Sequence, residues 1–193
     1  MVAKRLLRGK LQLSLLVLLA ILSMRAVCTA EPTPDQLLWK AALKGKGNVD
    51  LVKQALDQGA NVNVQKGGWT ILMRVVGEGH LEIAEILLAH TADPNMKGFR
   101  GETALTIAAE HGHTAIVKTL LAKGASVNAK TEHGDTALHY AAEFGHRDVV
   151  RVLLDAGADI KQIDQDGETA LDIARRKQYS EIILVFDRAR TTK

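Results

Sequence analysis

Apolar residues recur along most of this chain in short stretches with helical spacing, separated by polar segments that contain glycine. The clearest example is 134–161, where one apolar stretch ends in Phe-Gly-His and a second ends at Gly157. In the second stretch the apolar residues occupy positions i, i+1, i+4 and i+5: Val149, Val150, Leu153 and Leu154. This spacing predicts a helix with one buried face, and the glycine after it predicts a left-handed helix end. The pattern therefore predicts two short helices joined by a tight turn.

The same pattern repeats with a period of 33 residues. GDTALHYAAEFGHRDVVRVLLDAGADIK (134–161) matches GETALTIAAEHGHTAIVKTLLAKGASVN (101–128) and GWTILMRVVGEGHLEIAEILLAHTADPN (68–95) without an insertion. More divergent copies lie on both sides, as expected of terminal repeats whose outer faces meet water. We therefore predict five repeats, at about 31–63, 64–96, 97–129, 130–162 and 163–193.

A 33-residue period with Thr-x-Leu-x-x-Ala, Gly-His and Leu-Leu at fixed offsets resembles the ankyrin repeat. The resemblance implies an all-α ankyrin solenoid of about five helix-turn-helix repeats with projecting β-turn fingers. It also implies scaffold roles for four histidines, which hold turns and helix starts: His80, His113, His139 and His146. The N-terminal features described below make the chain similar to a bacterial-type exported ankyrin repeat protein.

Local signals give further expectations about the scaffold. Thr103 and Thr136 are placed to cap the first helix of their repeats, and Asp35 to cap the first helix of the array. Leu121 is expected on the buried face of its helix. Thr91 replaces the glycine that ends the second helix in other repeats, so this turn is expected to differ or to be mildly strained.

The first 30 residues have the features of a secretory signal peptide. A cationic start precedes the apolar run 11–22, and Cys28-Thr29-Ala30 gives small residues for cleavage before Glu31. We therefore divide the chain into a signal peptide, 1–30, and an ankyrin repeat domain, 31–193. The alternative is an uncleaved membrane anchor, which Arg25 in the cleavage region keeps open. We expect an exported protein of the bacterial periplasm, with secretion or outward-facing membrane anchoring as alternatives.

The basic charge of the chain belongs mainly to this N-terminal segment. The whole chain has 25 Lys and Arg and 22 Asp and Glu, but five of the cations and none of the acids lie in 1–30. Residues 31–193 therefore have 20 cations, which is 25 less five, against 22 acids. The charge gives no reason to expect a nucleic-acid partner.

The sequence contains no arrangement of residues that indicates catalysis or a cofactor. Gly-rich phosphate loops, Gly-x-Ser-x-Gly and His-Glu-x-x-His are missing. Asp164-Gln165-Asp166-Gly167 begins like a calcium loop, but the required acid is replaced by Arg175. We expect a protein that is not an enzyme and that holds no metal or cofactor.

In the ankyrin family the binding surface comprises the finger tips and the exposed side of the first helices. The resemblance places sixteen residues of this chain there: Lys66, Trp69, Glu78, Phe99, Arg100, Glu102, Glu110, His111, Glu132, His133, Asp135, Glu143, Phe144, Gln165, Asp166 and Glu168. Three are large aromatics, which favours an interface; the alternative is that one or two pack on a neighbouring finger. The acids predict a partner with a basic or neutral rather than an acidic surface.

These expectations define a function without identifying the partner. We expect a monomeric, exported protein–protein interaction module that binds a protein on its concave finger and helix surface. The alternative is an envelope accessory or protective factor for one specific enzyme, held at the membrane if the N-terminal segment is not cleaved.

Overall fold

The computed structural model describes residues 32–43 and 48–191. The predicted signal peptide and residues 44–47 between the two helices of the first repeat lie outside these residues. Among the residues described, no helix is long and apolar enough to cross a membrane.

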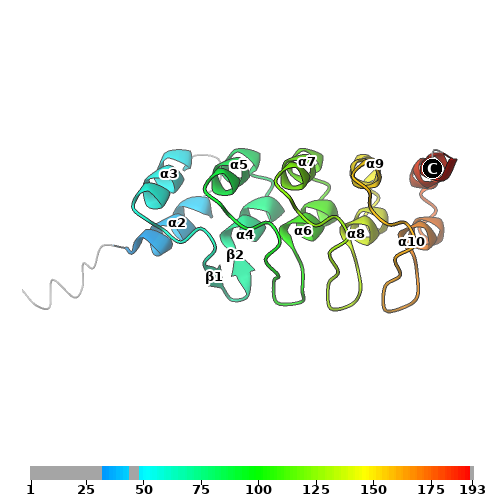
Figure 1. Cartoon of the computed structure of the whole chain (residues 1–193), viewed down its shortest axis with the longest axis horizontal. Coiled ribbons are helices and arrows are strands. Elements are labelled where there is room, and N and C mark those ends of the chain that lie inside the picture. The colour runs from blue at the N-terminus through cyan, green and yellow to red at the C-terminus, as the bar shows by residue number, and fades with distance from the viewer. Residues whose placement is uncertain (1–31, 44–47, 192–193) are drawn as a thin grey trace, which may run out of the picture. The chain divides into compact units, whose positions relative to one another are not determined.

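The described chain forms five consecutive pairs of helices, and all but the first pair are preceded by a projecting loop, which we call a finger (Figure 1). The helices are α2 (Pro34–Ala42), α3 (Val49–Asp57), α4 (Ile71–Gly77), α5 (Leu81–Ala89), α6 (Ala104–Glu110), α7 (Thr114–Ala122), α8 (Ala137–Glu143), α9 (Arg147–Asp155), α10 (Ala170–Arg176) and α11 (Ser180–Thr191). The finger before α4 contains a two-stranded antiparallel sheet, β1 (Gln65–Lys66) and β2 (Trp69–Thr70). The expected all-α ankyrin solenoid is confirmed.

The helices form two layers within the unit that begins at Pro34 (Figure 1). The first helices, α2, α4, α6, α8 and α10, lie side by side, and the second helices form the other layer. Apolar side chains fill the space between the layers, and Leu38, Leu72, Leu105, Leu138 and Phe186 are at most 1% exposed. Each repeat alone has too little apolar area to bury, so the repeats are stable only as a stack.

Threonines start the first helices, as the sequence predicts. The Thr103 hydroxyl accepts a hydrogen bond from the Thr106 N–H (3.3 Å), and the Thr106 hydroxyl accepts from the Thr103 N–H (2.8 Å). In the next repeat His139 takes the place of Thr106, and its Nδ1 accepts a hydrogen bond from the Thr136 N–H at 3.2 Å. His139 is 1% exposed, which agrees with a scaffold role.

Two local expectations are wrong. The first helix begins at Pro34, so Asp35 does not cap it; instead the Asp35 carboxylate accepts a hydrogen bond from the Asn61 N–H at 2.7 Å. Leu121 is only partly buried, because the core-facing position of α7 is Leu120, which is 0% exposed.

A series of asparagine bonds between successive repeats was missed by sequence reasoning. Asn63, Asn95 and Asn128 each accept a hydrogen bond at Oδ1 from a backbone N–H in the next repeat, at 2.8, 2.8 and 2.9 Å. Because these asparagines stand at equivalent positions of successive repeats, their recurrence in the sequence was the signal that could have indicated this role.

Thr91 keeps the glycine conformation of its equivalents, with φ +64°, where Gly59, Gly124 and Gly157 have φ between +84° and +88°. A β-branched residue in this region costs about 1–3 kcal/mol, whereas a glycine costs about 0.5–1 kcal/mol in lost unfolded-chain entropy. The turn of this repeat therefore keeps the left-handed conformation of the others, with backbone strain at Thr91.

We predict that Thr91→Gly stabilises the fold by about 1 kcal/mol, because it removes this strain. The measurement is urea unfolding followed by helical circular dichroism. The matched control is Gly124→Thr, which introduces the same strain one repeat later and is expected to lower the midpoint. A lower midpoint for Thr91→Gly would contradict the assignment of strain.

Candidate functional site

The sixteen predicted site residues lie at the fingers and at the accessible side of the first helices, and none is buried. We call this set the finger-and-helix surface. Ten are exposed: Lys66, Glu78, Phe99, Arg100, His111, Glu132, His133, Phe144, Gln165 and Asp166. Six are partly buried: Trp69, Glu102, Glu110, Asp135, Glu143 and Glu168.

Two of the three aromatics are accessible to a partner. Phe99 is 77% exposed at a finger tip, although its Cβ lies so close to Gly68 of the preceding finger that a side chain there would approach it to 3.1 Å. Phe144, directly after α8, is 49% exposed, and its ring stacks on His146 with 6.5 Å between the ring centroids. Trp69 differs, because it lies in β2 and packs against the core. Trp69 therefore follows the alternative that one of the three aromatics packs against the fold.

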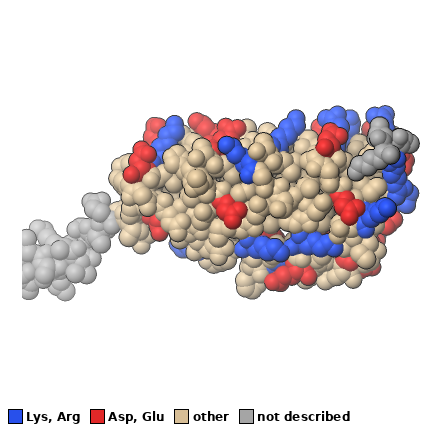
Figure 2. All heavy atoms as spheres, in the orientation of Figure 1, with Lys and Arg blue, Asp and Glu red and all other residues tan. Residues whose placement is uncertain are grey.

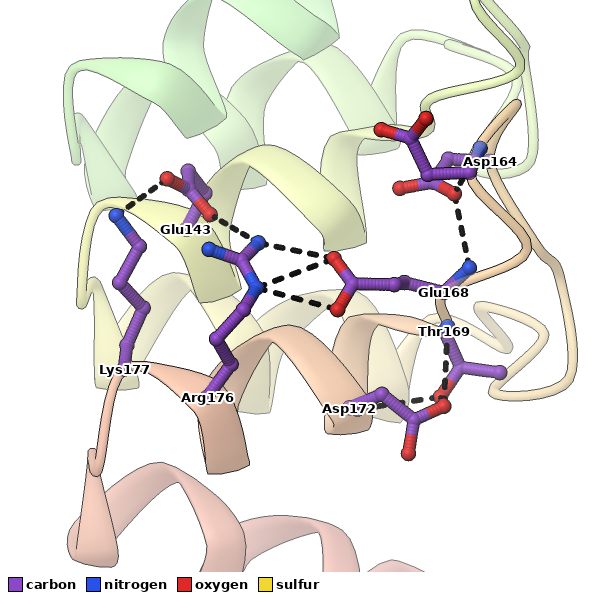
Figure 3. Close-up of polar contacts among 8 residues, drawn as sticks. Glu143, Asp164, Glu168, Thr169, Asp172, Arg176 and Lys177 are labelled. Atoms are coloured by element: carbon purple, nitrogen blue, oxygen red, sulfur yellow. Dashed lines mark hydrogen bonds and ion pairs between the residues drawn. The ribbon is translucent and has the colours of Figure 1, made fainter.

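The acids near α10 are neutralised by an ion-pair cluster that links repeats four and five (Figure 3). The Arg176 guanidinium lies between Glu143 and Glu168: Nη2 is 3.2 Å from Glu143 Oε2 and 3.0 Å from Glu168 Oε2. The Lys177 ammonium pairs with the other oxygen of Glu143. This end of the finger-and-helix surface therefore has less negative charge than its acids alone would give.

Three other acids, in repeats three and four, are not neutralised in this way. No ion pair with a described residue forms at Glu102, Glu110 or Asp135. Burial raises the pKa of Asp135, and the nearby charges of Asp164 and Asp166 raise it further, while His139 and His133 lower it. Ionised Asp135 is therefore disfavoured by its surroundings.

Tyr140 on α8 lies among these acids. Burial raises the pKa of its hydroxyl, followed by the charges of Asp135, Glu110 and Glu102. Because an anionic tyrosinate would be repelled by all three carboxylates, the hydroxyl stays neutral and can donate or accept a hydrogen bond. The site at Tyr140 therefore combines unpaired negative charge with a polar aromatic ring.

Histidines in the turns bond to the preceding repeat. His146 Nε2 lies 2.8 Å from the Glu110 carbonyl oxygen, and His113 Nε2 lies 3.4 Å from that of Gly77. His111 Nδ1 contacts the Ile107 carbonyl oxygen at 3.0 Å, and His133 Nδ1 contacts Gln165 Oε1 at 2.8 Å. Across residues 32–43 and 48–191, three or more His, Cys, Asp or Glu side chains do not converge into a group suited to a metal ion.

A row of long side chains joins the fingers and was missed by sequence reasoning. The Gln65 amide donates to the Lys97 carbonyl at 3.2 Å, the Lys97 ammonium to the Lys130 carbonyl at 3.1 Å, and the Lys130 ammonium to the Ile163 carbonyl at 3.4 Å. Figure 2 shows basic side chains lying lengthwise across the fingers on the face in view. The donors occupy equivalent positions of successive repeats, so this row fixes the fingers relative to one another.

Stacked helix pairs with exposed fingers and variable surface residues define a tandem-repeat scaffold, the class of protein that binds through a surface assembled from several repeats. The comparison with known families agrees. The model described as "Ankyrin repeats (3 copies)" matches 12–98, 37–131, 96–164 and 130–186. The chain belongs to the ankyrin repeat family, whose domains are generally non-catalytic and suggest a protein–protein interaction module.

The chain is also similar to parts of curated proteins. It is 47% identical over 64 residues to the 2-5A-dependent ribonuclease of Homo sapiens, which is 32% of this chain and 9% of that protein. The ribonuclease of Mus musculus is 40% identical over 76 residues, 38% of this chain and 10% of the mouse protein. An ankyrin repeat protein of Acanthamoeba polyphaga mimivirus is 39% identical over 66 residues, 34% of this chain and 41% of the viral protein. The chain thus spans about a tenth of the two ribonucleases.

We predict that Asp135→Asn stabilises the fold near neutral pH, because it removes a carboxylate whose pKa is raised on folding from its ordinary value of 3.8. The folded state binds more protons than the unfolded state between those two pKa values, so ionisation of Asp135 costs stability as the pH rises through that interval. The gain is expected to be present at about pH 7 and to shrink as the pH falls towards about 4.

Urea unfolding of the wild type and Asp135→Asn at both pH values measures this difference. Glu132→Gln, a change of the exposed acid on the same finger, serves as the charge-matched control. An Asp135→Asn variant that is less stable than the wild type at neutral pH would show that the carboxylate supports the fold.

Proposed function

We propose that this chain is an exported, non-catalytic binding module that docks a protein partner on the finger-and-helix surface. The observation that carries the proposal is the exposure of Phe99 and Phe144 on the surface that varies among otherwise regular repeats. Exposed aromatics surrounded by polar and charged residues are typical of interface hot spots, because a rigid ring buries much apolar area at little entropic cost.

The surface charge supports a partner that is basic or neutral where it meets repeats three and four. Glu102, Glu110 and Asp135 have no basic partner among the described residues, whereas Glu143 and Glu168 are already paired with Arg176. An acidic partner would add repulsion to carboxylates that are already partly desolvated.

We predict that the double variant Phe99→Ala/Phe144→Ala loses most of the partners that the wild-type protein captures from an envelope extract. Truncating two hot-spot aromatics is expected to cost at least about 2 kcal/mol, or about thirtyfold in affinity. Quantitative mass spectrometry of the captured proteins provides the measurement.

The matched control is Leu184→Ala on α11, because Leu184 is as exposed as Phe144, at 49%, but lies in the layer of second helices. This control is expected to retain the partners. Trp69 is left unchanged, since its packing against the core would confuse loss of binding with loss of stability. Equal capture by the double variant and the wild type would place the interface elsewhere.

Export is proposed from the sequence of 1–30, which has a cationic start, an apolar run and small residues before Glu31. We expect the periplasm of a bacterium, with secretion as an alternative. If the segment is retained, the same protein is a membrane-held accessory factor, for example one that protects a specific envelope enzyme.

N-terminal sequencing of the protein recovered from its native compartment is predicted to give Glu31 as the first residue. A start before residue 11, together with recovery in the membrane fraction, would favour the anchored alternative. Recovery from the cytoplasm with an intact N-terminus would contradict export, while leaving the proposed binding surface open to its own test.

A further inference from the structure

The chain contains, in repeats four and five, an internal example of how this surface binds a guanidinium. Arg176 lies at the end of α10 and reaches two acids: Glu168, just before the same helix, and Glu143, at its own equivalent position one repeat earlier (Figure 3). Arg176 Nε and Nη2 both donate to Glu168, at 3.0 to 3.2 Å. A planar guanidinium suits this arrangement, because its donors can serve two carboxylates at once.

One period earlier, the same two acid positions are present and the arginine is not. Asp135 is equivalent to Glu168, and Glu110 is equivalent to Glu143. The position of Arg176 is occupied by Glu143, which is itself drawn towards repeat five by Arg176 and Lys177. Because α6 packs on α8 as α8 packs on α10, the backbone positions of Asp135 and Glu110 correspond to those of the two acids that hold Arg176, with Asp135 one methylene shorter than Glu168.

The surroundings of Asp135 and Glu110 favour a cation from outside. The charges of Asp135, Glu110 and Glu102 all act on the hydroxyl of Tyr140 on α8. Thr131 is only 7% exposed, and its buried hydroxyl, which lies near Tyr140, has no well-formed hydrogen bond with a described residue. Phe144, at the position equivalent to Lys177, replaces that cation with a half-exposed aromatic ring, whose face attracts a guanidinium.

We propose that repeats three and four form a binding site for an arginine side chain of the protein partner. The guanidinium pairs with Asp135 and Glu110, as Arg176 pairs with Glu168 and Glu143, and stacks near Tyr140 and Phe144. This inference rests on the proposed protein-binding function and specifies the chemistry of the group that the partner supplies.

The test uses the full chain and a defined probe, the peptide acetyl-Gly-Arg-Gly-amide at millimolar concentration. Its binding is followed by ¹H–¹⁵N NMR, with resonances of Asp135, Tyr140 and Phe144 as reporters. A peptide with citrulline in place of arginine has nearly the same shape without the charge and is expected to leave these resonances unchanged. The lysine peptide is expected to bind more weakly, because an ammonium is not bidentate.

The variants Asp135→Asn and Glu110→Gln are each expected to weaken binding of the arginine peptide about threefold to tenfold. Glu132→Gln, on the same finger, and Glu82→Gln, on α5, serve as charge-matched controls and are expected to bind as the wild type does. Asp135→Asn has the further signature of weaker binding with higher stability near neutral pH, which a merely unfolded variant cannot show.

Equal shifts with the citrulline peptide, unchanged affinity in both variants, or shifts centred away from repeats three and four would overturn the proposal. Calcium chloride is tested separately, and tighter binding of calcium at the same resonances would replace the arginine site with a metal site.

If Phe99→Ala/Phe144→Ala loses the captured partners while Asp135→Asn/Glu110→Gln retains them, the interface is correct and the arginine site is wrong. Retention by both double variants would reject the proposed function itself.

Discussion

The structure depends on close contact between the turn of one repeat and an aromatic ring of the next. The rings of His113, His146 and Tyr179 lie against Gly79, Gly112 and Gly145, and a Cβ on Gly112 would meet the His146 ring at 2.5 Å. Glycine is therefore required at each of these turns for two reasons: the backbone has a positive φ, and the ring of the next repeat occupies the space that a Cβ would need. Gln178 occupies the equivalent position of the last repeat with φ +61°, and no described repeat follows to pack on it.

Because this contact repeats every 33 residues, it separates the residues that hold the stack from those that are free to vary. Threonine caps, asparagine bridges and the turn histidines His113 and His146 bond to backbone atoms, so these bonds do not depend on the identity of neighbouring surface side chains. Exposed side chains such as Phe99 at a finger tip lie outside these bonds, although Gln65, Lys97 and Lys130 join the fingers themselves. A binding surface can therefore change without altering the fold, which is why the family defines a scaffold and leaves the partner to particular residues.

The same division explains what the sequence predicted. The 33-residue period predicted the features that repeat, such as the Thr103 cap and the Gly-His turns, and it predicted the fold class. Trp69 was not, because its packing depends on the β1–β2 hairpin of one irregular finger. The Arg176 cluster could not be predicted in this way, because Glu143 and Arg176 are one period apart in the sequence and only the packing of α10 on α8 brings their side chains together.

Equivalent positions also show where the surface is costly. Arg176 and Lys177 together balance Glu143 and Glu168, whereas the equivalent acids one period earlier, Glu110 and Asp135, form no ion pair with a described residue and are partly buried. Uncompensated, half-buried charge lowers stability, and natural proteins retain such features mainly where a function uses them. A guanidinium bound between these carboxylates would replace the unfavourable burial and repulsion of their charges in the free protein with favourable ion pairs in the complex. Binding energy at this site would then come partly from relief of repulsion already present in the free protein, and would weaken at high salt where surface charges are screened.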